Sequence, residues 1–258
     1  MEDTTAGGML AKGLTLLVTI GQYPDGITLS ELARKVCMPV STVHRLLATL
    51  HTFGFVYFDV ESRRYSLGLR LFLLSQQVTL VRKLSEAALP VMRRVVEVTK
   101  ETALISILDG EEMMYVERVD SPQPVSVRGS SGGRGPLYCT AMGKSLLAFQ
   151  PEKEREAILQ RLHLERLTAH TITDRETLRR ELALTRERRY SIANEEHEPG
   201  VISVSVPVLD ERGQALAALC VTAPAFRATL AQLVENVPLL RDGAREIAIQ
   251  LPRSGTAT

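Results

Sequence analysis

Hydrophobic residues recur at helical spacing in three short stretches near the N-terminus. Apolar side chains in residues 9–20 cover most of the circumference of a helix. A second helix is expected after Ser30, a plausible N-cap, and should end at Met38, because the following Pro39 lacks an N–H group and restricts the residue before it. We place Pro39 as the first residue of the third helix. There Val43, Leu46, Leu47 and Leu50 form a single apolar stripe.

Polar residues of the third helix gather on the side opposite this stripe. They are Ser41, Thr42, Arg45 and Thr49 on the far face and His44 on its flank. Guanidinium, hydroxyl and imidazole groups can form hydrogen bonds with phosphates and base edges. The alternative is that they form the solvated face of an ordinary amphipathic helix.

A basic β-hairpin is predicted directly after this helix. Residues 55–58 and 63–67 have strand composition and flank a polar turn, and residues 27–29 can add a short strand. Arg63 and Arg64 lie where the hairpin of a winged helix meets the DNA backbone or minor groove. From Arg34 to Arg70, six lysines and arginines against two acidic residues give a local charge of +4. Helix, break, helix and basic hairpin together predict a winged helix-turn-helix that binds double-stranded DNA.

An unusually apolar segment follows the hairpin. Residues 69–81 predict a linker helix whose apolar surface would be costly if exposed to water. We therefore expect this helix to pack on a partner subunit or on the first helix. The boundary between two domains, residues 1–80 and 81–258, is placed at its end.

The second domain alternates between helical and strand patterns. Helices are expected at 83–99, at 140–149, from Pro151, from Thr173-Asp174 to 189, and at 229–251 with an interruption near Pro238. Strands are expected at 102–108, 113–119, 125–127, 202–209 and 215–222. The glycine-rich segment 129–135 reads as a surface loop without a dinucleotide or phosphate fingerprint. This order predicts an α+β domain with a mostly antiparallel sheet flanked by helices and a mouth for a small ligand.

Composition restricts the classes of protein to which the chain can belong. The chain has 258 residues, 45% of them hydrophobic, which is enough for packed cores. A net charge of +1 excludes a polycation, so contact with nucleic acid must rest on local charge. Three scattered cysteines support neither a disulfide scaffold nor a zinc ribbon. No cofactor motif, signal peptide or membrane-spanning run is recognised, so we expect a cytoplasmic protein with no membrane partner and a disordered tail from Pro252.

Several long segments resemble the IclR family of bacterial transcriptional regulators over nearly the full length. The first domain carries the resemblance in LSELARKVCMPVSTVHRLLATLHTFGFV and RRYSLG. In the second domain it rests on PLYCTAMGKSLLAF, LTAHTITDRETLRREL, RRYSIANEEHEPGVISVSVPVLDERG and ALCVTAPAFR. Their number and order make this match far more specific than a lone motif.

The resemblance implies a winged helix-turn-helix, a linker helix and a GAF-like effector-binding domain. It implies homodimers, often paired into homotetramers, that bind palindrome-like operators and act as repressors or activators of catabolic genes. It also implies a small-molecule effector. The corresponding effector-binding residues are Gly135, Thr140, Ala141, Met142, Val201, Ser203, Cys220 and Thr222.

One departure from the family pattern bears on the effector. Members that bind small oxo-acids have an aspartate just before the Glu-Glu motif, where this chain has Ala193. Met142 and Cys220 also make the expected pocket more apolar. We therefore expect a less polar effector, such as an aromatic or longer-chain acid.

Three other functions are weighed against this one. Glu195, Glu196, His197 and Glu198 have side chains suited to a metal, but alternate residues of an extended segment point to opposite faces. An enzyme would need a base beside a nucleophile such as Cys139, and no histidine has a recognisable pairing motif. The third alternative is a winged-helix protein whose second domain only oligomerises and binds no effector.

Overall fold

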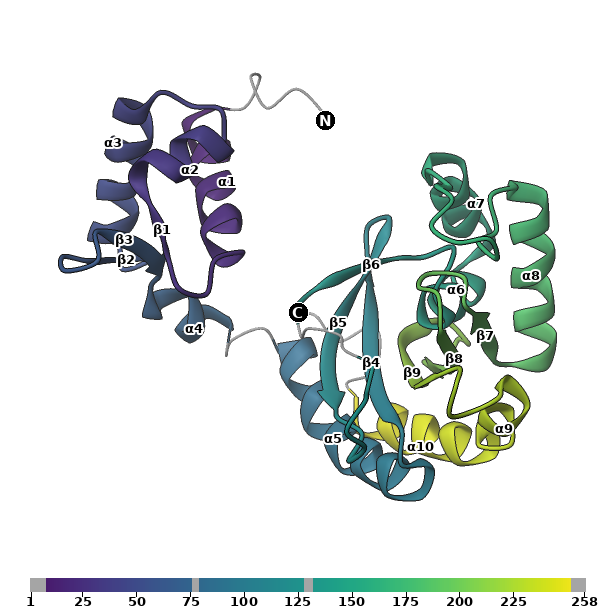
Figure 1. Ribbon diagram of the computed structural model, residues 1–258. Coiled ribbons are helices and arrows are strands. Elements are labelled where there is room, and N and C mark those ends of the chain that lie inside the picture. The colour runs from purple at the N-terminus through teal and green to yellow at the C-terminus, as the bar shows by residue number, and fades with distance from the viewer. Residues whose placement is uncertain (1–7, 76–78, 128–131, 252–258) are drawn as a thin grey trace. The chain divides into compact units, whose positions relative to one another are not determined.

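The computed structural model describes residues 8–75, 79–127 and 132–251. The chain divides into two compact units, Met1–Thr79 and Leu80–Thr258, and each is described by itself (Figure 1). The predicted class, an α+β protein with an N-terminal winged helix-turn-helix and a helix-flanked antiparallel sheet, is confirmed. The expected C-terminal tail lies outside the described residues.

The first unit is a three-helix cluster with a small sheet. Its elements are α1 (Met9–Gly21), β1 (Ile27–Thr28), α2 (Leu29–Lys35), α3 (Val40–Thr52), β2 (Val56–Asp59), β3 (Arg64–Leu67) and α4 (Leu69–Ser75). The strands form an antiparallel sheet in the order β1-β3-β2. The predicted stripe of α3 packs into the core, where Val43, Leu46 and Leu47 are buried against Leu16 and Leu32.

The start of α2 differs from the expectation. The N-cap is Thr28 rather than Ser30, which lies inside the helix. Thr28 Oγ1 accepts a hydrogen bond from the Glu31 backbone N–H, and the Glu31 carboxylate accepts one from the Thr28 N–H, which completes a capping box. Pro39 is likewise the N-cap of α3 rather than its first residue.

The first part of the predicted linker helix is α4, which begins at Leu69 as expected. Helix α4 ends at Ser75, residues 76–78 lie outside the described residues, and α5 (Thr79–Thr99) continues through the expected break near residue 82 with Pro90 inside it. The apolar face of α4 is exposed in the chain by itself: Leu69, Phe72 and Leu73 are each more than half exposed.

The second unit is built on one six-stranded antiparallel sheet. Its strands are β4 (Thr102–Asp109), β5 (Glu112–Val119), β6 (Arg134–Pro136), β7 (Ser191–Asn194), β8 (Val201–Leu209) and β9 (Ala215–Pro224). They are paired in the order β6-β5-β4-β9-β8-β7. Its helices besides α5 are α6 (Ala141–Ala148), α7 (Glu152–Arg161), α8 (Arg175–Arg188), α9 (Leu230–Val234) and α10 (Val237–Gln250).

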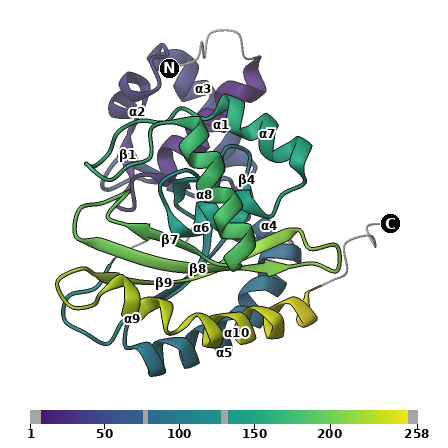
Figure 2. The same ribbon diagram turned by 90° about the vertical axis from the view of Figure 1, so that its right-hand side faces the viewer.

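Helices cover both faces of this sheet. Helices α5 and α10 lie side by side on one face, and α6 and α8 lie on the other (Figure 2). Because successive strand residues point to opposite faces, β4 sends Ala103 and Ile105 into the first layer and Leu104 into the second. Strand β9 divides in the same way, with Leu219 in the first layer and Cys220 in the second.

Two strand predictions in this unit are wrong. Residues 125–127 form no strand, and the third strand is β6, which pairs with β5 through residues expected to belong to a loop. Of the rest of that loop, residues 129–131 lie outside the described residues. Strand β7 was not expected at all. The closing helix is divided at Glu235 and Asn236, just before Pro238.

The described helices are also too short or too polar to cross a bilayer.

Candidate functional site

The outward face of α3 carries the polar residues predicted from its periodicity. Ser41, His44, Arg45 and Thr49 are exposed, and Thr42 is half-buried. The hydroxyl of Thr49 donates to the Arg45 carbonyl oxygen at 3.2 Å, so it has acceptor capacity but no free proton. Among the residues that the structure describes, the Arg45 side chain has only a long 3.9 Å contact from Nη2 to the Met9 sulfur, which leaves its guanidinium available to a ligand.

The two arginines of the hairpin have different environments. Arg63 is exposed at the turn, where its backbone adopts a φ of +54°. Arg64 is half-buried in β3, and its Nη1 donates to the Gly26 carbonyl oxygen at 2.8 Å. Arg64 therefore ties β3 to the turn before β1, and Arg63 is the freer of the two.

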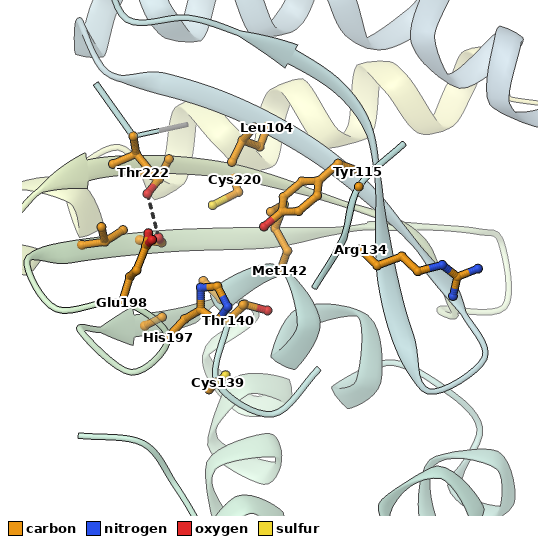
Figure 3. Close-up of a pocket in the computed structure, with 16 residues that line it drawn as sticks. Leu104, Tyr115, Arg134, Cys139, Thr140, Met142, His197, Glu198, Cys220 and Thr222 are labelled. Carbon is orange, nitrogen blue, oxygen red and sulfur yellow. Dashed lines mark hydrogen bonds between the residues drawn. The ribbon is translucent and has the colours of Figure 1, made fainter. Parts of the chain in front are cut away.

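A cavity of about 340 Å³ opens between α6 and the sheet of the second unit (Figure 3). Its lining includes seven residues expected from the sequence: Thr140, Ala141, Met142, Val201, Ser203, Cys220 and Thr222. They come from the start of α6 and from β8 and β9, and the fold brings them together across more than 80 positions of sequence.

Gly135 does not line the cavity. It lies in β6 behind Met113, where an added Cβ would come within 2.6 Å of the Met113 Cε. Its position keeps β6 close to the Met113 side chain and to the Tyr115 hydroxyl, 3.5 Å from that same Cβ position.

Several lining residues were missed by the sequence reasoning as binding residues. They are Leu104, Tyr115, Val127, Gly133, Arg134, Cys139, His197 and Glu198. Ala193, which was expected to bear on the effector, lines the cavity as well. The alternation along the strand at 102–108 puts Leu104 on a defined face, but which face meets a helix depends on the tertiary fold. The Glu195–Glu198 segment was expected to be extended but instead turns, since Glu195 has a φ of +55°. That turn brings both His197 and Glu198 to the cavity.

The start of α6 is held firmly beside the cavity. Thr140 Oγ1 accepts from the Gly143 N–H at 3.0 Å and donates to the Pro136 carbonyl oxygen at 2.7 Å, so the side chain has a structural role. Gly143 permits close packing, because a Cβ there would lie 2.5 Å from the Leu137 Cα. The first N–H groups of a helix have no intrahelical partner, and Ala141 and Met142 of this turn line the cavity.

A buried ion pair anchors the turn that carries His197 and Glu198. Lys144 of α6 has no exposed surface, and its Nζ lies 2.7 and 2.8 Å from the two carboxylate oxygens of Glu196. Its Nζ is also 3.9 Å from the Glu181 carboxylate. Lys144 is therefore occupied within the protein, and its role is to hold the turn against α6.

The two cavity thiols are poor nucleophiles. Burial raises the pKa of Cys139 to about 12 and also raises the pKa of Cys220, so both stay protonated at neutral pH. Among the described residues, no group of three or more His, Cys, Asp or Glu side chains is arranged to hold a metal ion.

The fold defines a class: a helix-turn-helix DNA-binding unit joined to an α+β unit with a small-molecule cavity. Two family models match the chain, the IclR helix-turn-helix domain at residues 9–60 and the bacterial transcriptional regulator IclR C-terminal domain at residues 76–249. The chain therefore belongs to the IclR family of transcriptional regulators, as the resemblance implied. The members it resembles are regulators rather than enzymes.

Individual relatives agree over nearly the whole chain. The probable transcriptional regulator SauR of Cupriavidus necator is 36% identical over 92% of this chain and 94% of its own length. KdgR, an HTH-type transcriptional regulator of Escherichia coli, is 37% identical over 93% of this chain and 91% of its own. An IclR homologue from Microbacterium hydrocarbonoxydans, solved in complex with 4-hydroxybenzoate, has 28% identity and a TM-score of 0.83, covering 95% of this chain and 99% of that one.

Proposed function

We propose that a small carboxylic acid, aromatic or otherwise, binds the cavity of the second unit and modulates operator binding by the first. The observation that carries this proposal is the cavity itself, which combines the first turn of α6 with a lining of both apolar and polar side chains. In this division of labour, residues 1–80 bind DNA and link the domains, and residues 81–258 bind the effector and oligomerise.

An acidic effector is favoured by the positively polarised groups of the cavity that are not already paired within the protein. Lys144 is paired with Glu196, and Arg134 is paired with Glu112 and Asp109 and points its guanidinium away from the cavity (Figure 3). Apart from His197, the remaining source of positive potential in the lining is the N-terminus of α6, where backbone N–H groups and the helix dipole favour an anion.

The hydrocarbon part of the proposed effector would contact apolar residues of the cavity lining. Leu104, Met142, Ala193 and Cys220 supply apolar contact area beside the helix start. The absence of an aspartate at position 193 is consistent with a less polar effector than a small oxo-acid. The relative solved with 4-hydroxybenzoate holds an aromatic acid, which supports this class for the present chain.

We propose that two copies pair through the first unit. Helix α1 presents Leu10, Leu14 and Val18 to solvent at 77%, 53% and 69% exposure, a stripe spaced by four residues that remains unpartnered in one chain. A dimer, or a tetramer built from two dimers, would cover this stripe and the face of α4. It would present two copies of α3 to half-sites about one helical turn, or a multiple of it, apart.

We assign the proposed DNA contacts according to how exposed each side chain is. Arg45 is the central base or phosphate contact, flanked on α3 by the side chains of Ser41, Thr42, His44 and Thr49. Arg63 contacts the backbone, and Arg64 chiefly supports the hairpin. Effector binding alters how subunits pack through the linker and hence the spacing of the two α3 helices.

Isothermal titration of the full chain tests the effector directly. Benzoate and 4-hydroxybenzoate are compared with glyoxylate and pyruvate, and we expect saturable one-site binding of an aromatic acid. Tight binding of glyoxylate or pyruvate alone would contradict the apolar preference. Failure of every acid to bind or to raise the melting temperature would favour a second domain that only oligomerises.

A further inference from the structure

The cavity wall opposite Tyr115 is arranged to accept hydrogen bonds. Ser203 Oγ donates to Thr222 Oγ1 at 2.9 Å, and Thr222 Oγ1 donates to the Ile202 carbonyl oxygen at 3.2 Å. The direction of the hydrogen bond from Thr222 to Ile202 is fixed, because a carbonyl oxygen can only accept. Both hydroxyl protons are thereby used, so Ser203, which lines the cavity, can offer a ligand acceptor capacity alone.

Glu198 adds a second acceptor to the same side. Glu198 is an exposed residue of the turn held by the Lys144–Glu196 pair, and it lines the cavity (Figure 3). An ionised carboxylate accepts hydrogen bonds and offers no proton. Ser203 and Glu198 therefore both favour a ligand that carries a hydrogen-bond donor.

Tyr115 supplies a complementary group from across the cavity. Its hydroxyl points into the space between Met142 and Cys220 and has no hydrogen-bond partner among the described residues (Figure 3). Burial, with smaller effects from Cys220 and Glu198, raises the pKa of Tyr115 to about 12, so the phenol keeps its proton at neutral pH. It can donate to a ligand oxygen as well as accept.

We propose that Tyr115, Ser203 and Glu198 select an effector that carries a hydroxyl group remote from its carboxylate, a hydroxy acid. A hydroxyl is a donor and an acceptor at once, so it can donate to Ser203 or Glu198 and accept from Tyr115. A plain hydrocarbon end would leave the Tyr115 hydroxyl without a partner after water is displaced, which costs binding energy. An ammonium group has donors but nothing to accept the Tyr115 proton.

This inference rests on the proposed acid effector and deepens it. None of the three selecting residues is needed to hold the start of α6, where the carboxylate is placed. Selection of the hydroxyl and binding of the acid can therefore be separated by mutation.

The test uses acids that differ only in the hydroxyl. Binding of 4-hydroxybenzoate is compared with benzoate, 3-(4-hydroxyphenyl)propionate with 3-phenylpropionate, and 4-hydroxybutyrate with butyrate, all by isothermal titration of the full chain. In the pair that binds most tightly, the hydroxy acid should bind at least about ten-fold better, the value of one well-made hydrogen bond. In Ser203→Ala the ratio should fall to within about three-fold of one because the hydroxy acid binds less tightly. In Tyr115→Phe it should fall as far because, in addition, the acid without the hydroxyl no longer leaves the Tyr115 hydroxyl without a partner and binds more tightly.

Ser205→Ala is the matched control. Ser205 lies two residues along the same strand, but its hydroxyl donates to the Leu219 carbonyl oxygen and does not line the cavity. It should keep the ten-fold ratio. Equal binding of both members of the tightest pair, or a ratio that survives in Ser203→Ala and Tyr115→Phe, would overturn the hydroxy-acid inference and leave the acid effector standing. If no acid binds at all, the proposed effector class itself is wrong.

Discussion

The two hairpin arginines differ in what they contact, although they are adjacent in sequence. Arg63 is exposed, whereas Arg64 donates to the Gly26 carbonyl oxygen at 2.8 Å. We expect Arg63→Ala to weaken DNA binding, to reduce the salt dependence by about one counterion and to leave the melting temperature unchanged. Arg64→Ala should lower stability by about 1–2 kcal/mol because it removes a part-buried charged hydrogen bond.

Fluorescence anisotropy across a salt series and calorimetric melting of both variants separate the two roles. A stability loss in Arg63→Ala with none in Arg64→Ala would reverse the assignment.

The Lys144–Glu196 pair is costly to break from one side only. Lys144→Met would leave the Glu196 carboxylate, only 8% exposed, without its cation, and we expect a loss of about 3–5 kcal/mol. The double variant Lys144→Met/Glu196→Leu removes both charges and should recover most of that loss.

Scanning calorimetry measures both variants, because it can resolve separate transitions for the two units. Equal destabilisation of the single and double variants would show that the ion pair is not what holds the turn.

The helix caps show how far the roles of individual residues could be predicted from the sequence. Thr28 and Glu31 have the spacing of a capping box, so the correct N-cap could be read from the sequence, whereas Ser30 has Ala33 at the matching position. The separate roles of Arg63 and Arg64 could not be read, because the contact to Gly26 spans 38 positions.

At the scale of elements, the start of α6 is the part of the cavity most sensitive to backbone position. Gly143→Ala would place a Cβ 2.5 Å from the Leu137 Cα and 2.6 Å from its carbonyl oxygen, so the helix must shift. We expect acid binding to weaken at least about ten-fold, since a displaced helix start misplaces its N–H groups. Isothermal titration with the tightest-binding acid measures this.

Gly13→Ala provides the comparison in α1, where an added Cβ meets no atom within 4 Å. Its affinity for the acid should match that of the unchanged chain. If Gly143→Ala also binds normally, the helix start does not hold the carboxylate.

Central elements could be predicted more readily than edge elements. Strands β4, β8 and β9 have long apolar runs because both of their faces are buried, and their positions were predicted within a few residues. Strands β6 and β7 are short edge strands, and β6 contains a glycine and a proline, so neither gives a strong strand pattern.

At the scale of the whole molecule, the site illustrates a limit of sequence reasoning. The effector residues were assigned by resemblance, since periodicity gives a face for Ser203 or Cys220 but not what that face meets. The structure places Tyr115, His197 and Glu198 beside them because β5 and the turn after β7 converge on α6. Contacts of this kind depend on strand order, which local patterns do not determine.

Two sites on one chain must also be energetically coupled if the protein is a ligand-responsive regulator. A coupling of about 1–3 kcal/mol corresponds to a change of roughly 5–150-fold in operator affinity. Arg45→Ala should weaken operator binding and leave acid binding intact, because Arg45 lies on α3 of the first unit and the cavity lies in the second.

The most direct measurement is operator affinity with and without bound acid. Genomic fragments captured by the purified protein supply the operator, and its anisotropy is titrated with the full chain at fixed salt, alone and with the tightest-binding acid at saturation. A change of about 5-fold or more, in either direction, is the predicted result. Unchanged operator affinity, with calorimetry showing the acid bound, would contradict the claim that the cavity regulates DNA binding.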